Sequence, residues 1–307
     1  MTPSRRSSRR LGRFAPSPTG PLHFGSLVAA VGSFADARAG GGAWLVRMED
    51  LDRTRELPGA ADAILRTLEA FGLHWDGAVL YQRTRTDAYA AALARLGALG
   101  FTYSCGCSRR EIALGGRTGP EGPIYPGTCR GGLPPGRPPR SIRLRVGDAR
   151  IGFADQVQGP QFQDLAAAVG DFVLRRADGI HAYQLAVVVD DAEQGVTDVV
   201  RGADLLLSTP RQILLQRRLG LPQPTYAHLP LAVDAAGRKL SKSHAALPVD
   251  ARDPLPALLR AWRFLGQPKP PERPGDVAGF WMWALANWNR ARVPTCANRP
   301  GADVIRP

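Results

Sequence analysis

One stretch near the start of the chain, Arg13–Ser26, constrains the fold more than any other segment. An apolar strand over 12–15 is predicted to run into a turn rich in proline and glycine, and from about Phe24 apolar residues recur at helical spacing. A strand, a tight turn and a helix N-terminus suit a phosphate group, because backbone N–H groups and the positive end of the helix dipole face the anion. The ring of His23 can donate to phosphate oxygens there, and Gly25 lets a ligand approach the backbone. Alone, the stretch is equally compatible with a turn that binds no ligand.

A second stretch, Gly237–Ser243, strengthens the phosphate interpretation. Two lysines flank a serine on a loop that begins with glycine, and ammonium groups placed there would stabilise charge that develops on a phosphate. Alone, such a run is more often a solvated basic loop. Together, the two stretches resemble the HIGH and KMSKS motifs of class I aminoacyl-tRNA synthetases, written here as His23-Phe24-Gly25-Ser26 and Lys239-Leu240-Ser241-Lys242-Ser243. The longer match over Arg13–Ser26 resembles the glutamyl branch of that class.

The resemblance implies a nucleotide site and two catalytic residues. His23 and Lys242 would act on the phosphate charge that develops when ATP is attacked. No dedicated Mg²⁺ cage is visible in the sequence, so we expect Mg²⁺ to be carried largely by the ATP phosphates and water. The residues expected to contact ATP are Pro16, Ser17, His23, Gly25, Ser26, Lys239, Ser241 and Lys242.

Length and composition place the chain among globular proteins with room for two domains: it has 307 residues, 44% apolar and 22% charged. No apolar run approaches the roughly 20 residues of a membrane span. Residues 1–10 contain four arginines and no apolar segment follows them, so we expect a disordered basic arm over 1–11 rather than a secretory signal. We therefore expect a cytoplasmic monomer with no membrane partner. The formal charge of +13 favours a polyanionic partner, although arginine usage also follows genome composition.

Strands and helices alternate after the first turn. Strands are predicted over 43–48 and 79–82, and helices from Pro58 to Gly72 and over 86–99. This alternation predicts an α/β fold with a parallel, Rossmann-like sheet. We divide the chain into a basic arm (1–11), the first half of the catalytic domain (12–102), a zinc-binding insertion (103–140), the second half (141–245) and a helical C-terminal region (246–307).

The second half is predicted with less regularity. Apolar runs indicate short strands in 142–153, 171–175 and 196–201 and helices over 210–219, 255–265 and 277–288. The run over 183–189 fits a buried strand or a helix, and the resemblance favours a helix. The last stretch, 291–307, is punctuated by proline and arginine, and we expect it to be poorly ordered.

Three cysteines fall within 25 residues, at Cys105, Cys107 and Cys129. Zinc prefers sulfur and nitrogen ligands, and a small insertion rich in glycine and proline lacks the apolar mass to fold by itself. No histidine lies between the cysteines, so the fourth ligand would be Tyr125 or a glutamate, Glu111 or Glu121; residue chemistry alone favours a glutamate. The alternative is three free thiols. Cys296 stands apart in the tail.

Recognition of an amino acid needs cations for its carboxylates and an anion for its ammonium group. Arg13 lies on the strand that enters the nucleotide turn and Glu49 ends the next strand, so both can reach one crevice at the carboxyl edge of a parallel sheet. The resemblance to glutamyl-type synthetases implies that Glu49 binds the ammonium group and that Arg13, Arg201 and Tyr183 bind the two carboxylates. Each could equally be an ordinary surface ion-pair member. The full glutamate set implied is Arg13, Ala15, Ser17, Glu49, Tyr183 and Arg201.

The resemblance covers roughly 12–265, a catalytic domain and little else, and about forty further residues are too few for a helical anticodon-binding domain. Together with the spacing of the cysteines and Tyr125, this resembles the glutamyl-queuosine tRNA(Asp) synthetases. That family implies one structural zinc ion on Cys105, Cys107, Tyr125 and Cys129. It also implies activation of L-glutamate with ATP in the absence of tRNA and transfer to queuosine of tRNA(Asp). A truncated glutamyl-tRNA synthetase and a non-catalytic RNA-binding regulator are the alternatives.

Overall fold

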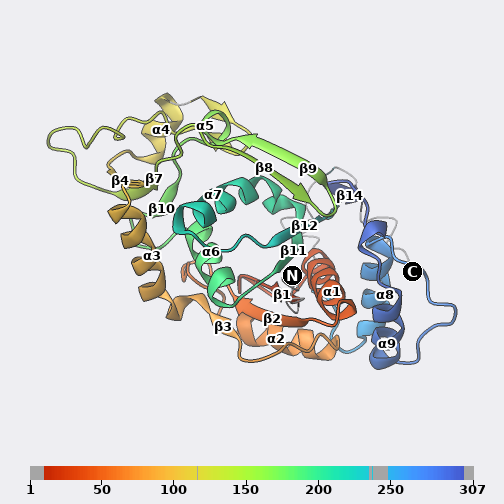
Figure 1. The fold of residues 1–307 in the computed structure, drawn as a ribbon. Helices are drawn as coiled ribbons and strands as arrows, with labels where there is room; N and C mark the ends of the chain where they lie inside the picture. The colour runs from red at the N-terminus through yellow and green to blue at the C-terminus, as the bar shows by residue number, and fades with distance from the viewer. Residues whose placement is uncertain (1–9, 116, 235–236, 238–247, 301–307) are drawn as a thin grey trace, which may run out of the picture.

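The computed structural model describes residues 10–115, 117–234, 237 and 248–300, and a parallel β-sheet lies at its centre (Figure 1). β1 pairs with β2, and β2 with β3, all in parallel. β11 pairs in parallel with β12, which meets β8 at one position. The N–H of Thr197 donates to the carbonyl of Leu11 at 3.0 Å, so β11 follows β1 across the molecule. These strands are β1 (Leu11–Phe14), β2 (Ala43–Met48), β3 (Leu80–Tyr81), β8 (Arg150–Asp155), β11 (Asp198–Gly202) and β12 (Thr225–Leu229).

The strand order is β3-β2-β1-β11-β12. The first half of the chain adds its strands on one side of β1 and the second half adds them on the other side, so the order reverses between β1 and β11. In parallel α/β sheets, ligands bind outside the carboxyl ends of the strands at such a reversal. The predicted α/β fold with a parallel sheet is confirmed. Arg13 on β1 and Arg201 on β11 therefore flank the point where a ligand is expected.

Helices cover both faces of this sheet, because alternate strand residues are apolar and point to opposite sides. On β11, Val200 packs in the core under α1, whereas Val199 packs in a second core with Tyr226. The first core is formed with α1 (Phe24–Ala39), α2 (Ala60–Ala70), α8 (Pro254–Phe264) and α9 (Val277–Asn287). The second is formed with α3 (Thr86–Ala98), α6 (Tyr183–Glu193) and α7 (Thr209–Leu219). The helix that the resemblance favoured from 183 onwards is confirmed as α6.

The insertion lies at one end of the molecule and α8 and α9 at the other (Figure 1). An antiparallel sheet in the order β10-β7-β4 supports the insertion, with short elements above it. None of the helices in the described ranges has the length and apolar character of a membrane crossing. The elements of this end are β4 (Thr102–Cys105), α4 (Arg109–Gly115), β5 (Thr118–Gly119), β6 (Gly122–Pro123), β7 (Ser141–Leu144), α5 (Leu165–Ala168) and β10 (Val173–Arg175).

The segment after the insertion differs from the prediction. The run over 142–153 forms two strands, β7 and β8, because the chain turns between them with Gly147 at φ +65°. β8 then pairs antiparallel with β9 (Gly159–Asp164), which was not predicted. β9 begins Gly-Pro and its Phe162 is 71% exposed, so it lacks the alternation that marks a half-buried strand.

The tail prediction was wrong over 291–300. β14 (Asn298–Pro300) pairs in parallel with β13 (Leu231–Val233), and directly before this stretch Arg290 forms an ion pair with the buried carboxylate of Asp36. Both contacts are made with residues distant in sequence, so local composition could not reveal them. β1 also begins at Leu11, inside the stretch predicted as the arm. Residues 1–9 and 301–307 lie outside the described part of the chain.

Candidate active site

The His23 turn joins β1 to α1, as the opening stretch of the sequence predicts. His23 is the N-cap of α1: its Nδ1 accepts the backbone N–H of Ser26 at 3.2 Å, and its Nε2 lies 3.0 Å from Ser26 Oγ. A Cβ on Gly25 would come within 3.3 Å of two ring atoms of His23. Glycine at 25 therefore leaves room for the imidazole to lie over the first turn of the helix, where the backbone N–H groups are exposed to an anion.

Two further contacts bring neighbouring segments to this turn. Glu49 donates its backbone N–H to the carbonyl of Pro16 at 2.9 Å, which fixes the end of β2 beside the turn. Val249 donates to the carbonyl of Leu22 at 3.0 Å, and Pro248 forms a β-bridge with His23. The chain thus meets the turn at 248–249, directly after 238–247. Lys239, Ser241 and Lys242 lie outside the described residues.

The four residues predicted to bind an amino acid come together on one face of the sheet. Arg13 projects from β1, Glu49 follows β2, Arg201 projects from β11, and Tyr183 begins α6, which covers that face. Arg201 Nη1 donates to Tyr183 Oη at 3.3 Å. Burial raises the pKa of Glu49 to about 7 against the opposing charges of Arg47, Arg13 and Arg201. Burial also raises the pKa of Tyr183, opposed first by Arg201. Ala15 and Ser17 follow β1 on the same turn.

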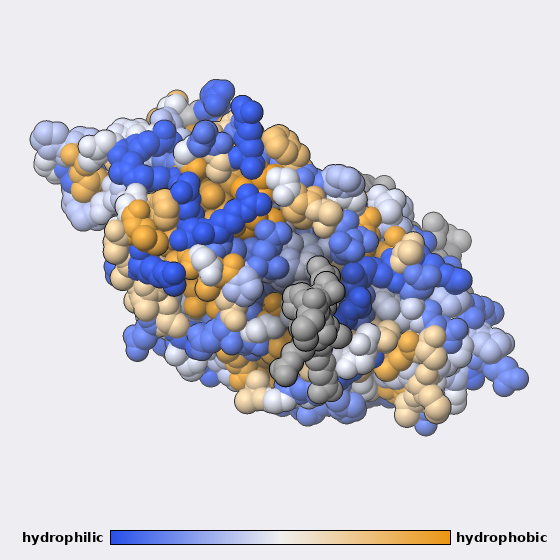
Figure 2. Space-filling view, viewed as in Figure 1, coloured by the Kyte–Doolittle hydropathy of each residue, from blue (hydrophilic) through white to orange (hydrophobic). Residues whose placement is uncertain are grey.

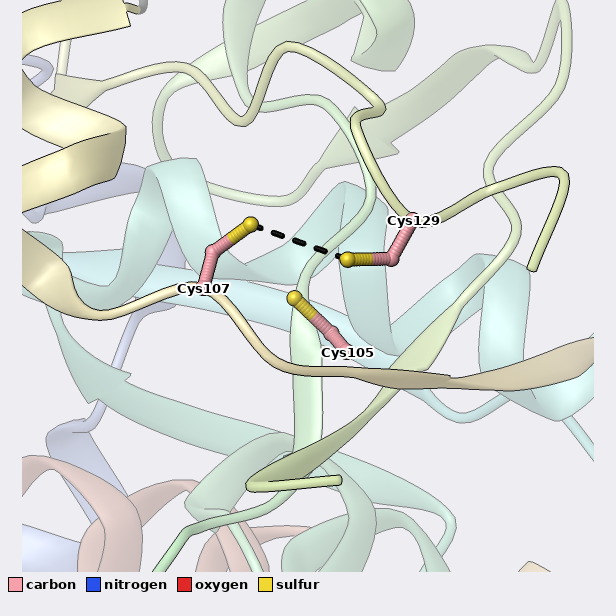
Figure 3. Close-up of side chains that lie close together, drawn as sticks. All are labelled: Cys105, Cys107 and Cys129. Carbon is pink, nitrogen blue, oxygen red and sulfur yellow. Dashed lines mark hydrogen bonds between the residues drawn. The ribbon is translucent and has the colours of Figure 1, made fainter. Parts of the chain in front are cut away.

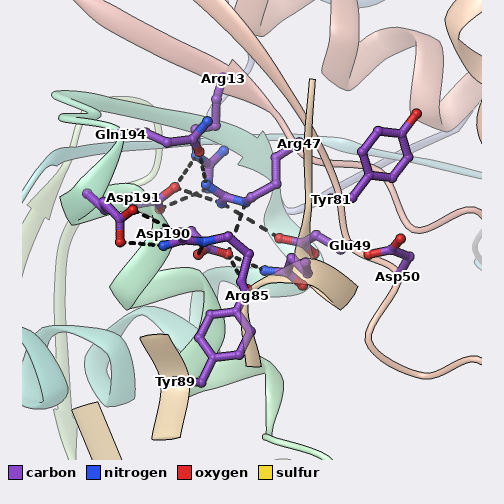
Figure 4. A network of polar contacts seen from close by, with 12 residues as sticks. Arg13, Arg47, Glu49, Asp50, Tyr81, Arg85, Tyr89, Asp190, Asp191 and Gln194 are labelled. Atoms are coloured by element: carbon purple, nitrogen blue, oxygen red, sulfur yellow. Dashed lines mark hydrogen bonds and ion pairs between the residues drawn. The ribbon is translucent and has the colours of Figure 1, made fainter. Parts of the chain in front are cut away.

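A buried charge network behind this pocket was not predicted (Figure 4). Arg47 of β2 is fully buried, and it donates from Nη2 to Asp191 Oδ1 and from Nη1 to Gln194 Oε1, both at 2.7 Å. Arg13 pairs with the same Asp191, from Nε at 3.2 Å and from Nη2 at 3.4 Å. The signal available in the sequence was an arginine inside the apolar strand over 43–48, which requires buried anionic partners.

Asp190 anchors the other side of α6 in this network. Its Oδ2 accepts from Gln82 Nε2 and from Tyr89 Oη, both at 2.8 Å, and its Oδ1 accepts from Arg85 Nε at 3.1 Å. Arg85 also forms an ion pair with Glu193 at the end of the helix. These contacts hold α6 against α3 and against the turn after β3. The helix that carries Tyr183 is therefore held in place by the ion pairs of Asp190 and Glu193 with Arg85.

The cysteine cluster lies in the insertion (Figure 3). The Sγ atoms of Cys105, Cys107 and Cys129 lie within 4.8 Å of one another, and those of Cys107 and Cys129 are 3.7 Å apart. Tyr125 Oη lies 3.4 Å from Cys105 Sγ and 3.9 Å from Cys107 Sγ. Zinc in a tetrahedron of three sulfurs and one oxygen would set edges of about 3.8 Å and about 3.5 Å. The Cys107–Cys129 and Tyr125–Cys105 distances come close to these edges, so the cluster could hold a metal ion.

The surroundings favour the thiolate of Cys105 in particular, whereas burial raises the pKa of the Cys107 thiol. Burial raises the pKa of the Cys105 thiol, but hydrogen bonds with Tyr125 and the backbone of Cys107 outweigh it and bring the pKa to about 7. The guanidinium of Arg143 lies 3.9 Å from the Tyr125 ring centroid, and Arg137 Nη1 donates to Cys107 Sγ at 3.7 Å. Both cations would offset the negative charge of three thiolates.

The two glutamates considered as alternative ligands are engaged elsewhere. Glu111 accepts from Arg137 Nη2 at 2.8 Å and from the N–H of Ser108 at 2.7 Å. Glu121 accepts from Arg211 Nη2 at 2.7 Å. Of the three candidate oxygen ligands, Tyr125 is the one whose oxygen contacts the cysteine sulfurs in the described structure.

A family model described as the catalytic domain of class I tRNA synthetases (E and Q) matches residues 11–266. A Dechloromonas aromatica protein named glutamyl-Q tRNA(Asp) synthetase is 60% identical over 286 residues, covering 92% of this chain and 95% of that protein. The protein of that name from Chromobacterium violaceum is 58% identical over 283 residues, with the same coverage. The one from Geobacter sulfurreducens is 58% identical over 297 residues, covering 94% of each.

Solved structures share the fold at lower identity. A glutamate tRNA ligase from Elizabethkingia meningosepticum, in complex with its amino acid, gives a TM-score of 0.79 at 23% identity and is covered over 68% of its length by 97% of this chain. The glutamate-tRNA synthetase from Elizabethkingia anophelis gives a TM-score of 0.80, also at 23% identity, with 97% of this chain covering 69% of it. These likenesses show that the sheet and its covering helices have the arrangement of a glutamyl-type synthetase.

Proposed function

Because this chain belongs to the class I tRNA synthetases of the E and Q type and is a ligase, we propose that it activates glutamate with ATP without tRNA and transfers the glutamyl group to queuosine of tRNA(Asp). The transfer part of the proposal is supported by relatives at 58–60% identity that carry the name glutamyl-Q tRNA(Asp) synthetase.

The observation that carries the amino-acid part is the charge arrangement at the reversal of strand order. Arg13 and Arg201 supply two guanidinium groups from adjacent strands, and Glu49 supplies a carboxylate from the end of β2. Glutamate carries two carboxylates and one ammonium group, so its charges complement this set. Arginine suits carboxylate because its planar fork can bond both oxygens at once. Tyr183 adds a hydroxyl donor beside Arg201.

In the first step, an oxygen of the glutamate α-carboxylate attacks the α-phosphorus of ATP, the bond to the β-phosphate breaks, and pyrophosphate leaves with its electron pair. His23 and the N-terminus of α1 stabilise the charge that builds up on the phosphate, and Lys242 does so from the motif at 239–243. In the second step, a hydroxyl of the acceptor attacks the acyl carbon and AMP leaves. Mg²⁺ supplies charge neutralisation on the leaving oxygens when it arrives with ATP.

Cys105, Cys107, Tyr125 and Cys129 would hold one zinc ion whose chemistry is structural, because four protein ligands leave no open position. Bound metal would fix the shape of the insertion. That insertion exposes several arginines, which suits contact with RNA phosphates. They are Arg109, Arg110, Arg117, Arg130 and Arg140. On the face in Figure 2, hydrophilic residues predominate and the apolar ones are scattered among them.

The test of this function is transfer of labelled glutamate to three RNAs: tRNA(Asp) with queuosine, tRNA(Asp) without it, and tRNA(Glu). We expect label on the first alone. Label on the acceptor end of tRNA(Glu) would instead indicate a truncated glutamyl-tRNA synthetase. Absence of transfer to all three, together with absence of ATP–pyrophosphate exchange, would indicate the non-catalytic regulator.

A further inference from the structure

The guanidinium of Arg201 is held by neutral groups. Nε donates to His228 Nε2 at 3.1 Å, and Nη1 donates to Tyr183 Oη at 3.3 Å. Nη2 donates to Thr209 Oγ1 at 2.9 Å and to Gln212 Oε1 at 2.8 Å. Among the described residues, no carboxylate lies within ion-pair distance of this guanidinium. Its position is thus fixed, while none of the described carboxylates is a direct counterion of its charge.

Arg13, the other arginine of the pocket, differs in this respect. Its Nε and Nη2 both face the carboxylate of Asp191, and both side chains are buried. Asp191 is shared with Arg47, whose Nη2 donates to Oδ1 at 2.7 Å, but it still gives Arg13 a direct carboxylate contact that Arg201 lacks. The two arginines are therefore not equivalent. Arg201 has more of its positive charge available to a substrate anion than Arg13 has.

The position of His228 follows from the pairing of two strands. β11 and β12 are parallel, and Arg201 and His228 are direct partners in their register. Their side chains lie on the same face of the sheet as Tyr226, whose ring stacks on the His228 ring at a centroid distance of 6.3 Å and an angle of 11°. His228 is fully buried. The imidazole is therefore held firmly at the side of the guanidinium.

The hydrogen bonds of His228 define which nitrogen carries its proton. Arginine Nε can only donate, so His228 Nε2 must accept, and the proton is on Nδ1. Nδ1 then donates to Asp155 Oδ2 at 2.6 Å. The other oxygen of Asp155 accepts backbone N–H groups from Val157 at 3.0 Å, Gln158 at 2.8 Å and His228 at 3.1 Å. Burial lowers the pKa of His228 to about 4, so the ring is neutral at pH 7.

We propose that His228 is a positioning residue for recognition of the substrate carboxylate: its neutral ring fixes the Arg201 guanidinium and keeps the Asp155 carboxylate away from it. A carboxylate in direct contact with Arg201 would compete with the substrate anion for its positive charge. A side chain without an acceptor would leave Nε unpaired and the guanidinium free to turn. The inference rests on the proposed function, since it requires an anionic substrate at Arg201.

Three variants of the full chain test this role in ATP–pyrophosphate exchange with glutamate and with glutamine. His228→Gln retains a neutral acceptor near the position of Nε2, and its glutamate KM should stay within about threefold of the wild-type value. His228→Ala should raise the glutamate KM about tenfold or more and leave the ATP KM unchanged. His228→Glu should lower the preference for glutamate over glutamine by about tenfold or more, because Arg201 would then be paired.

A core substitution controls for loss of stability. Val200 is next to Arg201 on β11, but its side chain packs in the core on the opposite face of the sheet. Val200→Ala leaves a cavity there, so it should lower the unfolding temperature. It should keep the wild-type glutamate KM and the wild-type preference for glutamate over glutamine. If His228→Glu does not fold, the comparison of His228→Ala with His228→Gln carries the test. Wild-type KM and preference in His228→Ala, or equal losses in His228→Ala and His228→Gln, would overturn the inference. Failure of the proposed function is distinct, because the wild-type protein itself would then show no exchange with glutamate.

Discussion

Arg47 lies near the end of β2 and Glu49 directly follows that strand, and 3.7 Å separates Arg47 Nη2 from Glu49 Oε1. Glu49 is the carboxylate proposed to bind the substrate ammonium group, and burial raises its pKa to about 7. Arg47 is the strongest of the charges that oppose this rise. The ionisation state of Glu49, and with it the proposed substrate binding, therefore depends on burial and on the opposing charge of Arg47, two residues earlier in the chain.

The first prediction is a pH dependence of glutamate activation. Because Glu49 must be ionised to bind an ammonium group, kcat/KM for glutamate should fall as the pH drops below about 7, by up to tenfold per unit, and level off above it. Glu49→Gln should lower kcat/KM by about 100-fold and remove this dependence. Glu69→Gln, an exposed change on α2, is the matched control. A flat wild-type profile between pH 5.5 and pH 8 would contradict the role of Glu49.

The second prediction concerns Lys242, which lies outside the described residues. Lys242→Ala should slow adenylate formation by about 100-fold or more and barely change the glutamate KM, as expected when a charge used mainly in the transition state is removed. Single-turnover measurements with saturating ATP and glutamate give the rate. Lys269→Ala removes the exposed third lysine of the chain and should leave the rate unchanged. Normal turnover with a raised glutamate KM in Lys242→Ala would assign the lysine to substrate binding instead.

The third prediction is one zinc ion per chain, measured by elemental analysis of protein purified without chelator. Cys107→Ser should lose the metal and lower the unfolding temperature, because the insertion has little apolar core of its own. It should impair transfer to tRNA more than pyrophosphate exchange. Cys296→Ser, which removes the one cysteine outside the cluster, should retain the zinc.

Tyr125→Phe separates the fourth ligand from the other three. Loss of the phenolate oxygen should weaken zinc binding by about tenfold or more in a competition with a chelator. Unchanged zinc affinity in this variant would give the fourth position to another oxygen ligand, and a zinc content near zero in the wild-type protein would remove the site altogether.

The fourth prediction is on stability, and it follows from the ordered tail. The carboxylate of Asp36 is 3% exposed and accepts from Arg290 Nε at 2.8 Å and from Trp288 Nε1 at 3.1 Å. Arg290→Met should lower the free energy of unfolding in urea by about 2–4 kcal/mol, because it leaves a buried charge without its main partner. Adding Asp36→Asn should recover part of the loss. Arg292→Met, at an exposed neighbouring position, is the control. Equal stability of the Arg290→Met and Arg292→Met variants would refute the role of the ion pair between Asp36 and Arg290.

The parts of the site predictable from sequence were those set by local pattern. The ends of β1 and β2 could be read from apolar runs, and parallel strands bring their carboxyl ends to one edge, so Arg13 and Glu49 were expected to meet. His228 and Asp155 were not predicted, because their roles depend on the register of β11 with β12 and on the meeting of β12 with β8. Such long-range pairings leave no periodic signal. The same reason hid β14, which pairs with β13 across more than sixty residues, whereas β9 forms a local hairpin with β8 and was missed because it lacks apolar alternation.

The central claim is that the pocket around Arg13, Glu49 and Arg201 activates glutamate without help from RNA. ATP–pyrophosphate exchange with glutamate, aspartate and glutamine, run with and without tRNA, tests it most directly. We predict full exchange with glutamate in the absence of tRNA and poor exchange with the other two, since an amide would leave a buried arginine unpaired and the shorter acid would not span both carboxylate positions. Exchange that appears only when tRNA is added would contradict the claim.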